Sequence, residues 1–310
     1  MSGDPTQDYF SDGVTEELLN SLSRLNELQV VARTSSFSFK GQNADILTIA
    51  HKLNVGTILE GSVRRAGNTV RITVQLINAA SGFHIWSQTY DRNLTDILKV
   101  QTDVATSVAK ELQIKLSGKD ANQMEIGGTT NAQAYDAYLR GLQRLPSADT
   151  ENEFRGVLQA ANSAVALDPN YAAALVLQVN ALWGLYAGAG DSGERDRIRE
   201  LARNAAERAV TLAPKFGEAH IALARIVRLG MYLDVGGALP EMESAIALPP
   251  GNAAVQSYYG SCQGLLGQQE VALAAIRRAI ALGSTELPPS RPIHVELIFC
   301  AALRAGFSGR

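Results

Sequence analysis

The sequence predicts an α/β domain followed by an all-α solenoid within its 310 residues. Between residues 56 and 92, apolar and polar side chains alternate with a period of two, which is typical of half-buried strands. After residue 131 the apolar residues recur with helical spacing, and a similar stretch of sequence appears four times. We therefore expect a small mixed-sheet α/β sandwich over residues 1–117, a linker over 118–131 and an α-solenoid over 132–310.

Helical and strand patterns alternate within the first domain. Asp12 and Gly13 are expected to cap a helix that begins at Val14, because a short polar residue commonly precedes the first helical turn. A helix capped by Asn93 or Thr95 is expected to close the domain at residue 116. The elements expected between these two helices are, in order, a short buried strand at 28–33, a helix at 44–54, and antiparallel strands that meet at turns at 67–68 and 80–82.

Three arginines in the stretch LEGSVRRAGNTVRITVQL raise the question of nucleic-acid binding. They are Arg64, Arg65 and Arg71. Such binding normally needs a concentrated positive field, but residues 1–125 contain 12 basic and 14 acidic side chains, and the formal net charge of the whole chain is −3. We therefore interpret the three arginines as solvated hairpin residues and expect no direct contact with nucleic acid.

The second half of the sequence consists of repeats. Equivalent alanines recur in the stretches SAVALDPN, RAVTLAPK, SAIALPPG and RAIALGST, at Ala164, Ala209, Ala245 and Ala279. Their spacings are 45, 36 and 34 residues. A period near 34, with alanine where helices cross and proline after the second helix, is the tetratricopeptide (TPR) pattern. It predicts about four helix pairs and an unpaired last helix at 292–307.

Four stretches of the first domain resemble the TolB amino-terminal-domain-like module. They are SGDPTQDYFSDGVTEELLNSL, VVARTSSFSFKG, ILEGSVRRAGNTVRITVQLINAASGFHIWSQTYDR and DILKVQTDVATSVAKEL, in the order of that family over residues 2–116. The resemblance implies a five-stranded mixed sheet between helices whose first strand is missing here, so the chain is expected to be a fragment. In bacteria, similar modules precede TPR repeats in membrane-anchored CadC-like transcriptional regulators and in class III adenylate cyclases.

Motifs that carry chemistry are weak in this sequence. The stretch GAGDSG at 188–193 has the spacing of a dinucleotide-binding loop, but a helical rather than a strand pattern precedes it, so we expect a plain connection. The four histidines are widely separated, and Cys262 and Cys300 lie in apolar helical patterns typical of buried thiols. We expect no enzymatic activity, no metal and no cofactor in this chain.

The most apolar stretch, at 171–190, approaches the length of a membrane span. Gln178 and Asn180 fall in its middle and no basic residues flank it, which favours a packed helix of the solenoid. We expect no membrane contact by this segment, with any anchor placed upstream.

The surface expected to bind a partner is the concave side of the solenoid, which the first helices of the repeats line. Arg225 and Arg228 are three residues apart, so in an α-helix they would share a face and could hold a peptide carboxylate. The alternative is that they form solvated pairs within the chain, for example with Glu218. The similarity of the repeats to TPR repeats implies the following groove positions: Asn180, Trp183, Glu218, Ile221, Arg225, Arg228, Ser257 and Ser261.

These observations predict a non-catalytic protein-interaction and sensory segment of a bacterial signalling protein, of the transcriptional-regulator type. Its partner is expected to be a protein or peptide in the groove. The alternatives are the regulatory C-terminal part of a class III adenylate cyclase, and an envelope structural or scaffold protein. Relatives with a single membrane span place this part in the periplasm, whereas a cytoplasmic location follows if no span precedes it.

Overall fold

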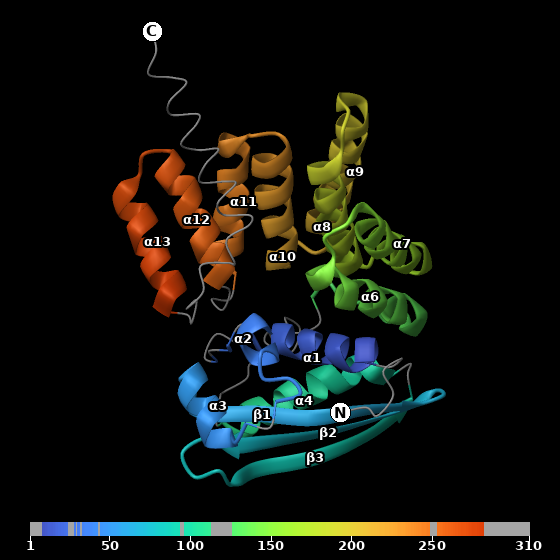
Figure 1. The fold of residues 1–310 in the computed structure, drawn as a ribbon, viewed down its shortest axis with the longest axis vertical. Coiled ribbons are helices and arrows are strands. Elements are labelled where there is room, and N and C mark those ends of the chain that lie inside the picture. Colours follow the sequence, from blue (N-terminus) through green and yellow to red (C-terminus); the bar gives the residue numbers. More distant parts are fainter. Residues whose placement is uncertain are drawn as a thin grey trace. The chain divides into compact units, whose positions relative to one another are not determined.

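A computed structural model describes residues 8–23, 28, 30–31, 33–42, 44–93, 96–112, 126–248 and 253–281. The chain divides into two compact units, Met1–Gly251 and Asn252–Arg310. Each unit is described by itself. The helices and strands are labelled in Figure 1.

The described sheet has three strands in the order β1-β2-β3, and both strand pairs are antiparallel. The strands are β1 (Thr57–Ala66), β2 (Thr69–Asn78) and β3 (His84–Asn93). The predicted meander is confirmed, because the chain turns at Gly67 and Asn68 and again at 79–81. The expected mixed sheet is corrected for the described residues: their sheet is antiparallel throughout, and Leu28, Val30 and Val31 are not in a strand.

One face of the sheet forms the core of the α/β part. The central strand β2 buries Val70, Ile72, Val74 and Leu76, in the alternation that the sequence predicts. Helices α1 (Asp8–Ser23) and α4 (Ile97–Glu111) pack near the strands, and α4 buries Val100, Val104 and Val108. The short helices α2 (Arg33–Phe37) and α3 (Ile46–Leu53) complete this part.

Two predicted helix caps are wrong. Helix α1 begins at Asp8, so Asp12 and Gly13 lie inside it instead of capping it. The carboxylate of Asp12 instead contacts the Lys40 ammonium at 2.5 Å. Helix α4 has Asp96 at its N-cap position instead of Asn93 or Thr95.

The rest of the described chain forms four antiparallel helix pairs, as the repeats predict. The first unit contains α6 (Ala132–Arg144) with α7 (Glu151–Leu167), α8 (Ala172–Gly188) with α9 (Ser192–Leu212), and α10 (Gly217–Ile221) with α11 (Val235–Ala247). A short 3-10 turn, Leu145–Ser147, follows α6. The second unit contains α12 (Ala253–Leu265) with α13 (Gln269–Ala281). The expected last helix at 292–307, with Cys300, lies outside the described residues.

The third pair has an unusual first helix. Helix α10 continues directly into a π-helical segment, Ala222–Met231, which has i→i+5 hydrogen bonds in place of i→i+4 bonds. Such segments are rare and usually confined to a single turn, often at functional sites. This segment packs against α8, α9 and α11.

The recurring alanines lie where helices cross. Ala164, Ala209, Ala245 and Ala279 are all buried, since larger side chains would force the paired helices apart. The stretch GAGDSG connects the end of α8 to the start of α9, as predicted. Helix α8 is a packed helix and Cys262 is buried, also as predicted. Among the helices of the described residues, none combines the length and apolarity needed to cross a bilayer.

Candidate protein-binding site

The α/β part and the first helix pair meet at a polar cluster that we call the Asp136 joint. It consists of Tyr9 of α1, Arg65 of β1, and Asp136 and Arg140 of α6. Oδ1 of Asp136 accepts hydrogen bonds from the Tyr9 hydroxyl at 2.9 Å and from Nη1 of Arg65 at 2.8 Å. Oδ2 accepts one from Nε of Arg140 at 3.0 Å. One carboxylate therefore connects a helix and a strand of the α/β part to the first repeat helix.

This joint corrects the interpretation of Arg65 as a solvated hairpin residue. Its guanidinium is half-buried and paired with Asp136, and it lies 5.4 Å from the ring centroid of Phe10. Arg71 is exposed, as expected, but forms two hydrogen bonds to the Asp91 carboxylate of the neighbouring strand, at 2.6 and 2.9 Å. Both arginines are therefore engaged within the chain.

Electrostatics favour the charged form of Asp136. Burial alone would raise the pKa of its carboxyl, but the hydrogen bonds from Tyr9, Arg140 and Arg65 outweigh burial and lower it. Burial and the hydrogen bond to Asp136 raise the pKa of the Tyr9 hydroxyl, which keeps it a donor. The charges and hydrogen bonds of the joint therefore support one another near neutral pH.

The same face of α6 contributes buried contacts beside the joint. The Tyr138 hydroxyl donates to Oε1 of Glu17 in α1 at 2.9 Å, and Tyr135 is hydrogen-bonded to Gln101 of α4. A Cβ atom added to Gly13 would lie 2.7 Å from Leu139, so helix α1 packs closely on α6. This chain itself therefore covers that face of α6, which is not available to a partner.

Asn180 and Trp183 of the predicted groove both lie on α8. The Asn180 side chain donates to the Val176 carbonyl of its own helix at 3.1 Å, which restrains its amide. Trp183 is half-buried and stacks on Tyr186, with ring centroids 5.9 Å apart and an interplanar angle of 17°. Trp183 is therefore held against Tyr186 with part of its surface exposed, and its role in binding stays a prediction.

Glu218 and Ile221 lie in α10 and are half-buried. Arg225 and Arg228 follow in the π-helical segment, and their side chains lie outside what the structure describes. With i→i+5 bonds more residues fit in each turn, so the α-helical spacing that would put Arg225 and Arg228 on one face does not apply here. Their role in binding stays a prediction.

Ser257 and Ser261 lie on α12 in the second unit. The Ser261 hydroxyl donates to the Ser257 carbonyl at 3.1 Å, which is the usual bond of a serine to the preceding helical turn. The other predicted groove positions belong to the first unit, so the place of these serines in a common groove stays a prediction.

A second group of side chains, which sequence reasoning missed, lies where α8, α9 and the end of the π-helical segment meet. We call it the arginine–tyrosine surface: Tyr186, Arg195, Arg199, Arg203, Tyr232 and Leu233. The guanidinium carbons of Arg199 and Arg203 lie 5.2 and 6.0 Å from the centroid of the Tyr232 ring, and that of Arg195 lies 5.9 Å from the Tyr186 ring. The spacing of four residues between the arginines on α9 was the available sequence signal.

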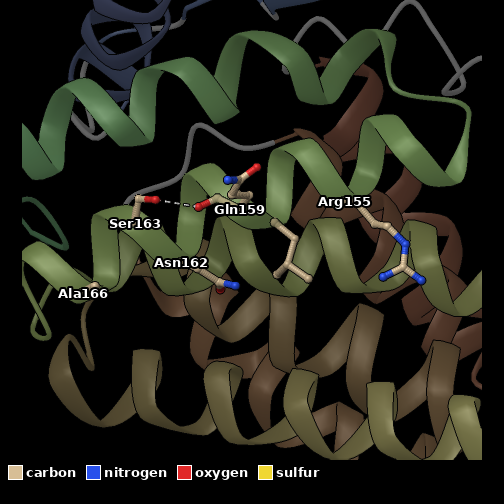
Figure 2. A pocket seen from close by; sticks show the side chains of 6 residues that line it. Arg155, Gln159, Asn162, Ser163 and Ala166 are labelled. Carbon is tan, nitrogen blue, oxygen red and sulfur yellow. Dashed lines mark hydrogen bonds between the residues drawn. The ribbon is translucent and has the colours of Figure 1, made fainter.

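A shallow groove of about 400 Å³ lies along α7. Figure 2 shows its lining side chains, which all come from that one helix: Arg155, Leu158, Gln159, Asn162, Ser163 and Ala166. Arg155 is paired with Glu151 at 2.6 Å, and Asn162 accepts a bond from Gln178 of α8 at 2.7 Å. Its polar groups are therefore largely engaged, which makes this groove the weaker candidate.

The described residues contain no group of three or more histidine, cysteine or acidic side chains placed to hold a metal ion. His220 has the structural role expected of a satisfied histidine. Its Nδ1 lies 2.7 Å from Glu241, and its Nε2 lies 3.0 Å from the Pro214 carbonyl. Glu241 is therefore a partner of His220.

Comparison with known proteins gives a partial match. No protein-family model matches the sequence. A protein of Rhizobium meliloti (strain 1021) named "Putative adenylate cyclase 3" is 40% identical over 176 residues, which are 56% of this chain. The chain covers only 30% of the length of that relative.

Two solved structures are also similar to this chain. The crystal structure of TTC0263, a thermophilic TPR protein of Thermus thermophilus, has a TM-score of 0.42 at 16% identity and covers 66% of this chain and 92% of its own. The MamA RS-1 ArsTM double mutant has a TM-score of 0.38 at 13% identity and covers 64% of this chain and 99% of its own. These values are too low to carry an argument about function.

Proposed function

We propose that this chain is a non-catalytic, protein-binding and regulatory segment of a bacterial signalling protein. The observation that carries the proposal is the Asp136 joint, because α6 belongs both to the helix pairs and to the packing of the α/β part. A partner that binds the other helix pairs of the first unit would act on the same compact unit that contains the α/β part. The helix pairs would then recruit the partner, and the α/β part would transmit or dock.

The interpretation of the helix pairs as TPR repeats supports a protein or peptide as the partner, since stacked helix pairs create extended binding surfaces. The TolB-like reading of the α/β part belongs to the same proposal. So does a periplasmic location, which would require a membrane span elsewhere in the protein.

The second part of the proposal concerns the kind of signalling protein to which this segment belongs. The name of the Rhizobium meliloti relative favours an adenylate cyclase over a transcriptional regulator, with the cyclase chemistry placed outside this chain. In that case the chain would regulate cyclic AMP formation and would not perform it. Transcriptional regulation remains the alternative, and recognition of DNA would then also lie outside this chain.

Selection of peptides from a displayed random library on the purified full chain tests protein binding. We expect enriched peptides with a common pattern that bind in solution. A library that enriches no more on this chain than on an unrelated immobilised protein would contradict the proposal.

A segment exchange tests the regulatory role. In the Rhizobium meliloti relative, deletion of the region that matches this chain should change the rate of cyclic AMP formation, and insertion of this chain should restore it. The purified chain alone, given ATP and Mg²⁺ or Mn²⁺, should form no cyclic AMP. A deletion without effect would contradict regulation, and cyclic AMP made by the chain alone would contradict a non-catalytic role.

A further inference from the structure

Leu233 has an unusual backbone conformation at the end of the third repeat's first helix. Its φ is +55°, in the left-handed region that branched side chains rarely adopt, and its side chain is 57% exposed. It directly precedes Asp234, the N-cap of α11, where an apolar residue often packs back onto the helix. Here the side chain points largely to solvent instead. A strained backbone therefore presents an apolar side chain to the outside, a combination that is concentrated at functional sites.

The neighbouring Tyr232 is held between cations and a carboxylate. Arg199 and Arg203 lie over its ring, and its hydroxyl donates to Oε1 of Glu200 at 2.8 Å. The Nε atoms of both arginines are buried without a hydrogen-bond partner.

Tyr186 extends this surface across the second and third helix pairs. Its hydroxyl donates to the carbonyl of Met231 at 3.4 Å, its ring faces Arg195, and Trp183 stacks on it. Tryptophan, tyrosine and arginine are the residues that most often dominate the binding energy of protein interfaces. The surface also adjoins the end of the π-helical segment, which is a second independent marker of a functional place.

The charge of the surface suits an acidic partner. Arg199 pairs with Asp196, and Arg203 pairs with Glu200, both within α9. Arg195 instead donates from Nε to the Ala189 carbonyl at 3.0 Å. Arg195 therefore lies outside the two ion pairs of Arg199 and Arg203, which leaves its positive charge for a carboxylate of a partner.

We propose that the arginine–tyrosine surface docks an acidic protein segment that carries an apolar anchor. The anchor packs on Leu233 and Tyr232, and the flanking carboxylates meet Arg195, Arg199 and Arg203 through charge-assisted hydrogen bonds. This inference rests on the proposed protein-binding function and specifies the chemistry of the partner.

Three labelled hexapeptides test the docking surface by fluorescence anisotropy with the full chain. The acidic probe has the sequence Asp-Glu-Leu-Phe-Asp-Glu, the basic probe replaces its acids by lysines, and the third replaces Leu-Phe by Ser-Ser. We expect the acidic probe to bind at least about tenfold more tightly than either other probe, and to weaken with added salt. Equal binding of the three probes overturns the proposal. Tighter binding of a single-stranded oligonucleotide overturns it too, because arginine and aromatic groups also bind bases.

Two variants locate the binding. Arg199→Gln with Arg203→Gln should weaken the acidic probe about tenfold, whereas the matched control Arg277→Gln with Arg278→Gln on α13 should leave it unchanged. Leu233→Gly should weaken binding and at the same time raise the melting temperature, because glycine relieves the left-handed backbone. Unchanged affinity in either surface variant overturns the proposal.

The failure of this inference can be separated from failure of the proposed function. If peptides selected from the displayed library bind, but none loses affinity in the Arg199→Gln/Arg203→Gln variant, protein binding stands and this docking surface is wrong. If no selected peptide binds the unmodified chain, the proposed function fails as well.

Discussion

Arg65 and Asp136 are 71 residues apart in the sequence, and their side chains meet at 2.8 Å between Nη1 and Oδ1. Arg65 comes from the end of β1, and Asp136 comes from the second turn of α6. The pair is half-buried, so water screens it less than an exposed ion pair. It fixes the β1–β2 hairpin against the first repeat helix, and Tyr9 at the start of α1 donates to the same carboxylate.

The substitution Asp136→Asn should destabilise the chain by about 2 kcal/mol, since it removes the charge that three donors share. Urea unfolding of the full chain measures this loss. Hydrogen exchange should also rise in α1 and α6 more than in α9. The matched control is Asp91→Asn, which breaks the exposed pair with Arg71 and should cost clearly less, because water screens an exposed ion pair. Equal losses of unfolding free energy in the two variants would show that the joint stabilises the chain no more than an exposed ion pair does.

Acid should loosen the Asp136 joint. The pKa of this carboxyl is lowered in the folded chain, so its contribution to stability is full above the unfolded value of about 3.9 and is lost as the pH falls through the lower folded value. Unfolding free energies measured from pH 6 to pH 2 should therefore fall less steeply in Asp136→Asn than in the unmodified chain. Parallel curves for the two proteins would exclude Asp136 as a source of the acid sensitivity.

The repeats were predictable from sequence, and the joint was not. Regular spacing of small residues reflects a local requirement, since small side chains let two consecutive helices pack closely, and Ala164 and Ala209 are both fully buried. The Asp136 joint depends on side chains that the sequence separates by 71 to 131 residues. Periodicity in a sequence does not indicate contacts between residues that are so far apart along the chain. The sequence alone therefore favours a solvated Arg65.

The sequence likewise indicates some features of the candidate site and gives no signal for others. Its position in the repeat predicts Trp183 as a groove residue, and that role stays a prediction; the structure shows that Trp183 stacks on Tyr186 of the same helix. The π-helical segment has no signal in the alanine- and arginine-containing stretch that forms it, because tertiary packing decides its winding. Leu233 adopts a positive φ that its residue type disfavours, so sequence reasoning has no ground to place it there.

Alkaline pH should destabilise the folded chain, because tyrosines are buried between α1 and the first helix pairs. Burial, followed by the charge of Glu17, raises the pKa values of Tyr138 and Tyr171 well above the usual range. An unfolded tyrosine ionises near pH 10, so their stabilising effect is complete below that pH and is lost as the pH rises further. Tyr171→Phe should reduce this alkaline loss in unfolding experiments between pH 8 and pH 11. An unchanged alkaline limb would contradict this role.

Gly184→Ala should destabilise the packing of α7 on α8. A Cβ atom at this position would lie 2.3 Å from the Phe154 ring, so the whole ring has to move. We expect a loss of about 1–3 kcal/mol in urea unfolding, as for other overpacked cores. Gly188→Ala is the matched control at the end of the same helix, because no atom lies within 4 Å of its added Cβ. It should be neutral or slightly stabilising, and a loss as large as that of Gly184→Ala would refute the steric explanation.

Thr150→Ala should weaken the start of α7. Thr150 and Glu153 form a capping box, in which the threonine hydroxyl oxygen accepts from the Glu153 N–H and the Glu153 carboxylate accepts from the Thr150 N–H. The Glu153 carboxylate also accepts from the Asp149 N–H, and this bond, followed by those from the hydroxyl and the N–H of Thr150, lowers the pKa of Glu153 to about 2. Loss of such a cap costs about 1 kcal/mol, which urea unfolding can measure. Thr150→Ser keeps the acceptor and should retain most of the stability. If Thr150→Ser loses as much as Thr150→Ala, the threonine methyl group and not the cap stabilises this turn.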